Sequence, residues 1–303
     1  MADYTVYFNG EWMPDSQVTY DRRDRGIVYG DCVFDGGRAF NGVPFRLRDH
    51  IQRLFRSLKH ARIDPGLTPE EMEALTEEAV RRNEHLLADA GDFVYGYTVT
   101  RGPGRRAYFA GPPTVLVTVG PEGFSFFAQY YENGVHAAIA QSRSYDPVSL
   151  DPKLKHRSRM NFSLAEIEAN DIDPGAWPIL LDTDGNISEG TINNVFVVTD
   201  GAVRSPTDRA ILQGVSRDVV LELAKQLNIP AYEEDLQPYD LYTADEAFFT
   251  GSSYCVMPVT RVDRRPIGDG KPGPITEQLL AAWSETVGVD IVDQAVTFAD
   301  KQQ

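Results

Sequence analysis

Residues 152–169 read PKLKHRSRMNFSLAEIEA, a basic loop followed by a predicted helix. The loop holds two of the six lysines of the chain, Lys153 and Lys155, beside His156 and two arginines. Crowded positive charges lower the pKa of a lysine, and a neutral amine is the nucleophile that forms a Schiff base. The same residues would also suit a solvated basic loop that binds an acidic neighbour. The loop by itself leaves both interpretations open.

Length and charge limit the classes of partner. The chain has 303 residues with 42% hydrophobic content, which is enough for one large domain or two modest ones. Its formal net charge of -16 argues against nucleic acid, because phosphate binding needs a basic surface. Arginines nevertheless cluster at 101, 105 and 106 and again at 157 and 159. These clusters suggest a site for a small anion.

The cysteines, the first residues and the apolar runs indicate a cytoplasmic protein. Cys32 and Cys255 are the only cysteines, which excludes a disulfide framework. Residues 1–4 lack the basic and apolar parts of a secretory signal. No apolar run approaches the roughly 20 residues of a membrane span, and the histidines and cysteines form no ligand cluster. We therefore expect no membrane partner and no bound metal.

Short strands alternate with helices along the chain, which predicts an α+β fold. A Gly-Pro-Glu-Gly stretch at 120–123 is the best candidate for a break. The predicted division is a small α+β domain over 1–120, a linker over 121–134 and a large domain over 135–303. No G-x-G-x-x-G or P-loop motif is present. The expected strands are 4–8, 93–100, 114–119, 135–141, 178–182 and 194–199, and the expected helices are 68–87, 161–170, 216–227, 275–287 and one capped by Asp49.

Two polar motifs follow the lysine segment. Residues 184–196, DGNISEGTINNVF, place Glu189 just before a predicted strand, where an acidic turn residue is common. Residues 212–218, LQGVSRD, place Gly214 ahead of a helix that starts near Ser216. A glycine there allows close backbone approach, and the positive end of the helix can bind an anion. A simple helix cap explains that motif equally well.

Two further motifs carry hydroxyl or guanidinium groups. Residues 249–259, FTGSSYCVMPV, contain two adjacent serines that also suit a plain polar turn. Residues 50–54, HIQRL, begin a helix whose spacing puts His50, Arg53 and Ser57 on one polar face. The apolar stripe lies on the opposite face. Periodicity alone therefore predicts that Arg53 is exposed to solvent.

These five motifs, taken in their order along the chain, resemble the fold-type IV pyridoxal phosphate (PLP) enzymes. That family includes branched-chain and D-amino-acid aminotransferases, (R)-amine transaminases and aminodeoxychorismate lyases. The resemblance implies a two-domain α+β fold with PLP as cofactor, and it makes Lys155 the catalytic lysine that carries PLP as a Schiff base. Glu189 takes the position of the carboxylate that pairs with the pyridine nitrogen. The other cofactor-binding residues that it implies are Arg53, Asn194, Gly214, Val215, Ser216, Ser252 and Ser253.

The substrate-binding motifs match different branches of the family. The strand VFDGGR at 33–38 resembles that of branched-chain enzymes, although Asp35 replaces their glutamate. The loop RGPGRRAY at 101–108 resembles that of D-amino-acid enzymes, with Arg106 at the position of an arginine that binds the substrate carboxylate. Their histidine is replaced by Tyr108 and their tyrosine by Phe34. The predicted substrate-binding residues are Phe34, Arg38, Tyr97, Arg106 and Tyr108.

The resemblance predicts a class IV transaminase. It would exchange an amino group between a 2-keto acid and a branched-chain amino acid, a D-amino acid or an (R)-amine. A homodimer or higher oligomer is expected, because family members complete each site with a loop of the partner subunit. One alternative is an aminodeoxychorismate-lyase-like enzyme, although the lyases carry threonines where this chain has Asp35-Gly36. The other is a non-catalytic anion-binding protein with the same fold.

Overall fold

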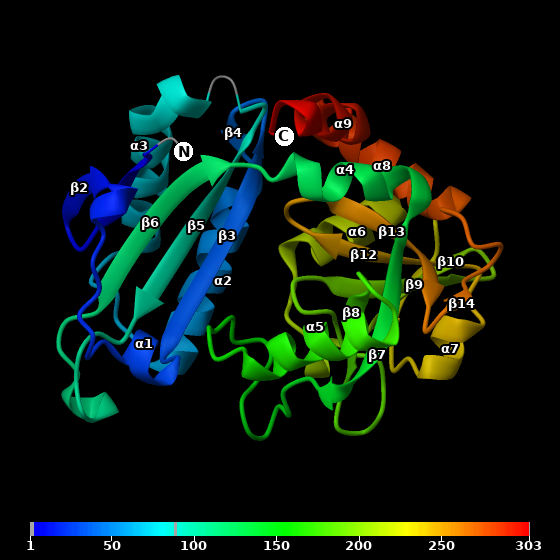
Figure 1. The fold of residues 1–303 in the computed structure, drawn as a ribbon, viewed down its shortest axis with the longest axis horizontal. Coiled ribbons are helices and arrows are strands. Elements are labelled where there is room, and N and C mark those ends of the chain that lie inside the picture. Colours follow the sequence, from blue (N-terminus) through cyan, green and yellow to red (C-terminus); the bar gives the residue numbers. More distant parts are fainter. Residues whose placement is uncertain (1–2, 88–89, 303) are drawn as a thin grey trace. The chain divides into compact units, whose positions relative to one another are not determined.

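The computed structural model describes residues 3–87 and 90–302. The chain separates into two compact units (Figure 1). The first contains residues up to Glu122 together with Leu154–Arg159, and the second contains Gly123–Lys153 and the chain from Met160 onward. The α+β class is confirmed, because each unit builds one sheet and packs helices on it. The predicted domain limits stay a prediction, and their outer ends at residues 1 and 303 lie outside the described residues.

The first unit contains a six-stranded sheet in the order β2-β1-β6-β5-β3-β4. The central strands β3, β5 and β6 are antiparallel neighbours. Their residues alternate between a buried face and a partly exposed face, as period-two strands do. The strands are β1 (Thr5–Phe8), β2 (Glu11–Pro14), β3 (Cys32–Phe40), β4 (Val43–Pro44), β5 (Phe93–Thr100) and β6 (Thr114–Pro121).

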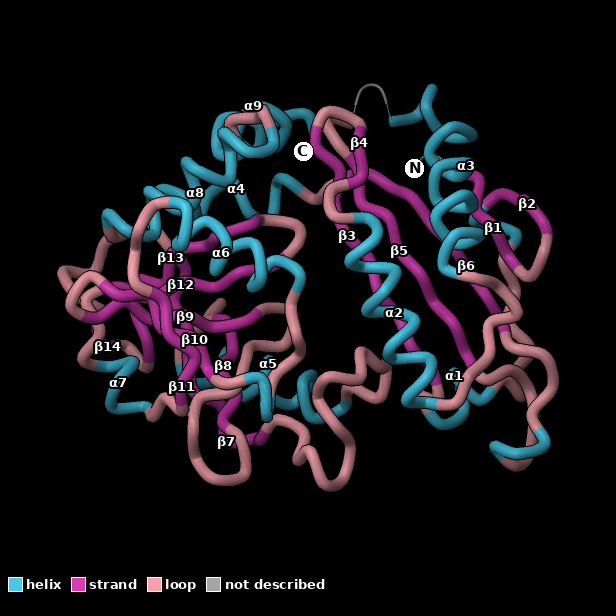
Figure 2. The backbone as a smooth tube through the Cα atoms, turned by 180° about the vertical axis from the view of Figure 1, so that it is seen from behind, coloured by secondary structure: helices cyan, strands magenta, loops and turns pink. Residues whose placement is uncertain are grey.

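Two long helices cover the buried face of this sheet. Helix α2 (Leu47–Ala61) contacts β3, and α3 (Pro69–Leu87) contacts β1 and β6. Figure 2 shows α2 lying along the strands. The apolar residues of α2 recur at helical spacing and are buried, which fixes this helix on the sheet. A short helix, α1 (Arg25–Tyr29), precedes β3.

The second unit contains an eight-stranded mixed sheet. Its path is β11-β10-β9-β12-β13-β7-β8, with β14 paired to β13. Strands β8 and β12 are buried at every residue, and β9 at every residue but its last, so this sheet forms the core. Its strands are β7 (Val135–Arg143), β8 (Trp177–Leu181), β9 (Asn194–Thr199), β10 (Ala202–Pro206), β11 (Ala231–Glu234), β12 (Glu246–Gly251), β13 (Cys255–Val262) and β14 (Arg265–Pro266).

Helices pack around this second sheet. Helix α5 follows the lysine segment and contacts β7 and β8, while α6 contacts β11 and β12. No helix among the described residues is long and apolar enough to cross a membrane. The helices are α4 (Phe124–Asn133), α5 (Met160–Ile172), α6 (Val215–Gln226), α7 (Pro238–Tyr242), α8 (Pro274–Val287) and α9 (Ile291–Gln302).

Most predicted elements are confirmed to within about two residues at their ends, the scatter usual for helix boundaries. One cap is wrong. Helix α2 begins at Leu47 after Arg46 in a left-handed conformation, and Asp49 lies in its first turn within 3.1 Å of the Arg46 guanidinium. Helix α4 lies inside the predicted linker range and buries Phe124 and Phe127.

Candidate active site

Residues 155–157 of the lysine segment run along the start of β3 as an extra strand that is paired through a single bridge. The amide of Phe34 donates to the carbonyl of Lys155 at 3.0 Å, and the amide of Arg157 donates to the carbonyl of Cys32 at 3.0 Å. Between these bonds, Val33 and His156 form an antiparallel bridge. This pairing explains why Leu154–Arg159 belongs to the first unit although the residues on both sides belong to the second.

Side-chain bonds hold the same segment from two sides. The amide of Lys155 donates to Ser57 Oγ of α2 at 3.2 Å, and Ser158 Oγ donates to the carbonyl of Gly30 at 2.9 Å. A Cβ at Gly30 would lie 2.5 Å from Ser158 Oγ, so glycine permits this close approach. The backbone of Lys155 is therefore held between β3 and α2.

His156 does not add a positive charge beside Lys155. Its side chain is buried, and burial together with the charge of Arg159 lowers its pKa to about 4. Nδ1 accepts a bond from the amide of Ser158, which a neutral imidazole can do. The prediction that crowded cations surround Lys155 therefore holds only for the arginines.

The polar face of α2 is buried, which contradicts the exposure that periodicity predicted for Arg53. Arg53 Nε and Nη2 donate to the two carboxylate oxygens of Asp35, each at 2.8 Å. His50 Nδ1 lies 2.9 Å from Asp35 Oδ1. All three side chains are at least nine-tenths buried. The polar face of α2 can thus be buried against the sheet because the Asp35 carboxylate of β3 pairs with it.

Burial and pairing set the charges of this cluster. Burial alone would raise the pKa of Asp35, but the charge and hydrogen bonds of Arg53, with those of His50, hold it well below its usual range. Burial lowers the pKa of His50 and outweighs the opposing effect of Asp35. At neutral pH the cluster is an ion pair with a neutral histidine. Asp35 and His50 were not predicted as site residues.

A second set of predicted residues meets in the second unit, around Glu189. One of its carboxylate oxygens accepts from the amide of Leu212 at 2.9 Å and from Asn194 Nδ2 at 3.4 Å. Asn194 also donates to the carbonyl of Leu212 at 3.0 Å. Glu189 and Asn194 are both buried. These bonds fix the orientation of the Glu189 carboxylate.

The start of α6 lies against the same cluster. Gly214 is the N-cap residue, and no side chain caps the helix there. A Cβ at Gly214 would lie 2.0 Å from Asn194 Oδ1, so only glycine fits without a shift. The first amides of a helix have no partner within it, so the amides at Val215 and Ser216 suit an anion. Arg217 anchors this turn, because it donates to Ser205 Oγ at 2.8 Å and to Glu233 at 2.7 Å.

Ser252 and Ser253 lie in the turn between β12 and β13, where both are partly exposed. Thr250 Oγ1 donates to the carbonyl of Cys255 across this hairpin at 2.6 Å. The structure therefore brings Glu189, Asn194 and Gly214 into contact. It leaves the phosphate role of the two serines a prediction.

The structure separates two of the predicted substrate residues. Tyr97 pairs with Asp35 across the sheet, so it shares the helix-covered face, where its hydroxyl lies 2.8 Å from Thr76 of α3. Phe34 is on the other face, because successive strand residues alternate. Phe34 and Tyr97, which were both predicted to bind the substrate, therefore lie on opposite faces of the sheet. Arg38 shares the face of Phe34 but is buried, with Nε 4.0 Å from Glu122 Oε2.

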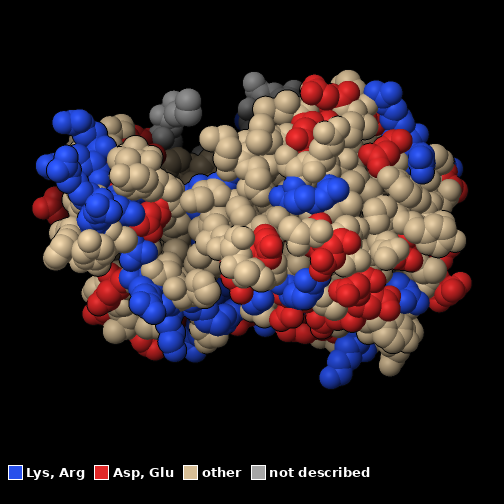
Figure 3. All heavy atoms as spheres, turned by 90° about the horizontal axis from the view of Figure 1, so that it is seen from below, with Lys and Arg blue, Asp and Glu red and all other residues tan. Residues whose placement is uncertain are grey.

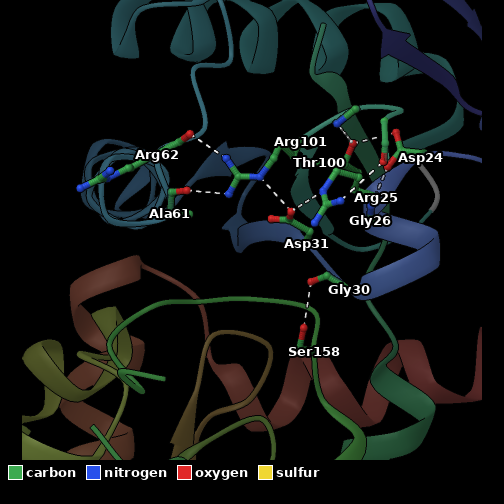
Figure 4. Close-up of polar contacts among 12 residues, drawn as sticks. Asp24, Arg25, Gly26, Gly30, Asp31, Ala61, Arg62, Thr100, Arg101 and Ser158 are labelled. Atoms are coloured by element: carbon green, nitrogen blue, oxygen red, sulfur yellow. Dashed lines mark hydrogen bonds and ion pairs between the residues drawn. The ribbon is translucent and has the colours of Figure 1, made fainter. Parts of the chain in front are cut away.

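The 101–111 loop has a fixed base and an exposed tip. Arg25 and Arg101 converge on Asp31 (Figure 4), with Nε–Oδ2 distances of 2.9 and 2.8 Å. Arg101 also donates to the carbonyls of Ala61 and Arg62 at the end of α2. Burial would raise the pKa of Asp31, but bonds from Arg101 and Arg25 lower it. Arg101 is therefore a structural residue of the loop base.

Arg106 and Tyr108 lie at the exposed tip, where Tyr108 packs near Phe109 with ring centroids 4.8 Å apart. Figure 3 shows Lys and Arg side chains gathered at the left of the view, on the first unit. No ion pair of Arg106 is found among residues 3–87 and 90–302. The tip is thus accessible to a ligand or another chain.

A family model described as "Amino-transferase class IV" matches residues 32–262. The chain belongs to the class IV aminotransferases. A Methanocaldococcus jannaschii protein with the provisional name branched-chain-amino-acid aminotransferase is 37% identical over 286 residues, 92% of this chain and 95% of that protein. The D-alanine aminotransferase of Bacillus licheniformis is 31% identical over 285 residues, 93% of this chain and 96% of that one.

Solved structures agree with this assignment. The T.th. branched-chain amino acid aminotransferase, solved with pyridoxamine 5'-phosphate, has a TM-score of 0.86 and 27% identity, and the match covers 95% of each chain. The similarity therefore extends over both units of this class IV aminotransferase. It includes relatives named for branched-chain amino acids and for D-alanine, so the comparisons leave the substrate to be argued from the residues.

Proposed function

We propose that this class IV aminotransferase uses PLP to exchange an amino group between an amino acid and a 2-keto acid. The observation that carries the proposal is Lys155, a lysine whose backbone is fixed by β3 and α2 while its side chain stays partly exposed. A lysine that carries a cofactor needs a fixed backbone and an accessible amine. The other lysine of the segment, Lys153, instead forms an ion pair, with its Nζ 3.2 Å from Asp151 Oδ1.

The described residues fit PLP. An uncapped helix start with a glycine that a Cβ would fill suits a phosphate. A buried carboxylate held by Leu212 and Asn194 suits a protonated ring nitrogen. We propose that Lys155, Arg53, Glu189 and Asn194 bind the cofactor, together with the α6 start and the serine turn at Gly214, Val215, Ser216, Ser252 and Ser253.

Bound PLP supplies an electron sink for the electrons released when the substrate loses its Cα proton. Lys155 then acts at Nζ as the general base that removes this proton and as the acid that returns it. Glu189 supports the positive ring nitrogen through its fixed carboxylate. The proposed substrate contacts are Phe34 on β3 and, at the loop tip, Arg106 and Tyr108. Arg38 stays a proposed ligand, although its burial beside Glu122 disfavours that role.

We further propose that the protein is cytoplasmic and at least a homodimer. The exposed aromatic tip of the 101–111 loop supports a partner chain, since exposed apolar side chains grouped together often mark an interface. Light scattering should give at least twice the mass of one chain. A fully active monomer would contradict this.

The test of the proposed function is a panel of L-amino acids, D-amino acids and (R)- and (S)-amines. The measured quantity is the conversion of bound PLP to pyridoxamine phosphate in the absence of a keto acid. We expect conversion with at least one amino acid and reversal by a 2-keto acid. Release of more than one equivalent of pyruvate per active site without any amino acceptor would indicate a lyase. Absence of a visible-wavelength band after PLP addition and removal of unbound PLP would indicate a non-catalytic protein.

A further inference from the structure

Three positive groups of the first unit surround the ring of Phe34. Lys155 Nζ lies 4.8 Å from the ring centroid, Arg157 Cζ lies 4.0 Å from it and Arg159 Cζ lies 5.7 Å from it. The same ring is thus contacted by a guanidinium and by the amine that the proposed function makes reactive. Contacts of this kind between a guanidinium and a ring fix the orientation of the arginine.

Strand pairing puts Lys155 and Arg157 on one face. The extra strand pairs Val33 with His156 and bonds Phe34 to Lys155 and Cys32 to Arg157. Residues two apart in a strand point to the same side, so the side chains at 155 and 157 share the side of Phe34. His156 points to the opposite side and is buried. The two cations are therefore neighbours by construction of the backbone.

Arg157 differs in its charge partners from Arg53 and Arg101 of the same unit. Arg53 is paired with Asp35, and Arg101 with Asp31. Arg157 is exposed, and within the described part of the chain no carboxylate lies within ion-pair distance of it. An oriented guanidinium without a protein carboxylate is prepared for a carboxylate from outside.

We infer that Arg157 binds the carboxylate of the amino-acid substrate. This inference rests on the proposed function. The substrate nitrogen must take the place of Lys155 Nζ on the cofactor, and the carboxylate of an α-amino acid is only two bonds from that nitrogen. A cation beside Lys155 on the same face is therefore placed to pair with this carboxylate, and Arg157 occupies that place. No described contact connects Arg106 with Lys155 or Phe34.

The experiment uses the PLP-loaded enzyme and the variant Arg157→Met, which keeps an apolar side chain over Phe34 and removes the charge. The first measurement is the affinity for 4-methylvalerate, which has the carbon skeleton of leucine but no amine and cannot react. Loss of the charge-assisted pair should weaken it by about 10- to 100-fold. The affinity for the uncharged amide of the same acid should stay within about twofold. Arg157→Lys should recover part of the loss.

The second measurement compares the half-reaction with leucine, in the enantiomer that the wild type prefers, and with 3-methylbutylamine, which is leucine without its carboxylate. Arg105→Met, at an exposed arginine of the 101–111 loop that has no role in the proposed site, is the matched control, and Arg106→Met is tested beside it as the competing carboxylate site. We expect a selective loss for leucine in Arg157→Met and little change in the control. Equal losses for both substrates would show that Arg157 acts on Lys155 or the fold, and a selective loss only in Arg106→Met would move the carboxylate to the loop. Either result overturns the inference, whereas a wild type that converts no amino acid would refute the proposed function itself.

Discussion

Asp35 holds a full negative charge in the core of the first unit, where Arg53 binds it through two nitrogens and His50 contacts it. The sequence placed an acidic residue on an apolar strand and a polar face on α2, but it could not pair them. That pairing depends on the register of α2 over β3, which is a tertiary contact. The helix period was correct, and the exposure inferred from it for Arg53 was wrong.

Asp35→Asn should destabilise the protein by about 3–5 kcal/mol, because it leaves the Arg53 charge buried without its counter-charge. Urea unfolding at neutral pH measures this change. The control is Glu73→Gln, which removes a partner of the mostly exposed Arg48 and should cost no more than about 1 kcal/mol. Equal effects of the two substitutions would mean that the Asp35 pair contributes no more than a surface pair.

His156 should make the fold sensitive to acid. Its pKa is about 4 in the folded protein and about 6.5 when unfolded, so between these values the unfolded chain binds a proton that the folded chain does not. Stability therefore falls as the pH drops from about 6.5 towards 4. His156→Gln should reduce this slope by up to about 1.4 kcal/mol per pH unit. The exposed His60→Gln is the control, and an unchanged slope in His156→Gln would show that the histidine titrates normally.

At the scale of elements, the start of α6 shows what local sequence can predict. The Gly-Val-Ser motif correctly indicated a helix start with a glycine before it, since the glycine and the amides of the first turn belong to one short segment. The contact of Gly214 with Asn194 was not predictable, because Asn194 comes from β9. The extra strand at 155–157 was missed for the same reason, as strand pairing between distant segments leaves no local pattern.

Gly214→Ala should displace either Asn194 or the helix start, because the added Cβ would lie 2.0 Å from Asn194 Oδ1. We expect a loss of about 1–3 kcal/mol in stability from overpacking, together with weaker binding of PLP in an absorbance titration. Gly123→Ala is the matched control, since Gly123 also caps a helix but a Cβ there meets nothing within 4 Å. Normal PLP binding by Gly214→Ala would remove the α6 start from the proposed site.

At the scale of the whole molecule, the order of motifs predicted the family and the α+β class, and both are confirmed. Composition and periodicity could not show that Leu154–Arg159 belongs to the first unit, because the segment lies between stretches of the second. They also did not reveal α4, where a Gly-Pro-Glu-Gly signal precedes an aromatic helix. Local sequence patterns thus identified most helices and strands and their order along the chain. Which of these elements are in contact depends on long-range packing, which the patterns do not contain.

The central claim is that Lys155 carries the cofactor, and covalent mapping tests it most directly. The PLP-loaded protein is reduced with borohydride, digested and analysed by mass spectrometry, with Lys155→Ala and Lys153→Ala as parallel samples. We expect one phosphopyridoxyl adduct, on Lys155, in the wild type and in Lys153→Ala. Lys155→Ala should lack both this adduct and transamination while keeping its fold by circular dichroism. An adduct on Lys153, or near-wild-type turnover by Lys155→Ala, would contradict the account.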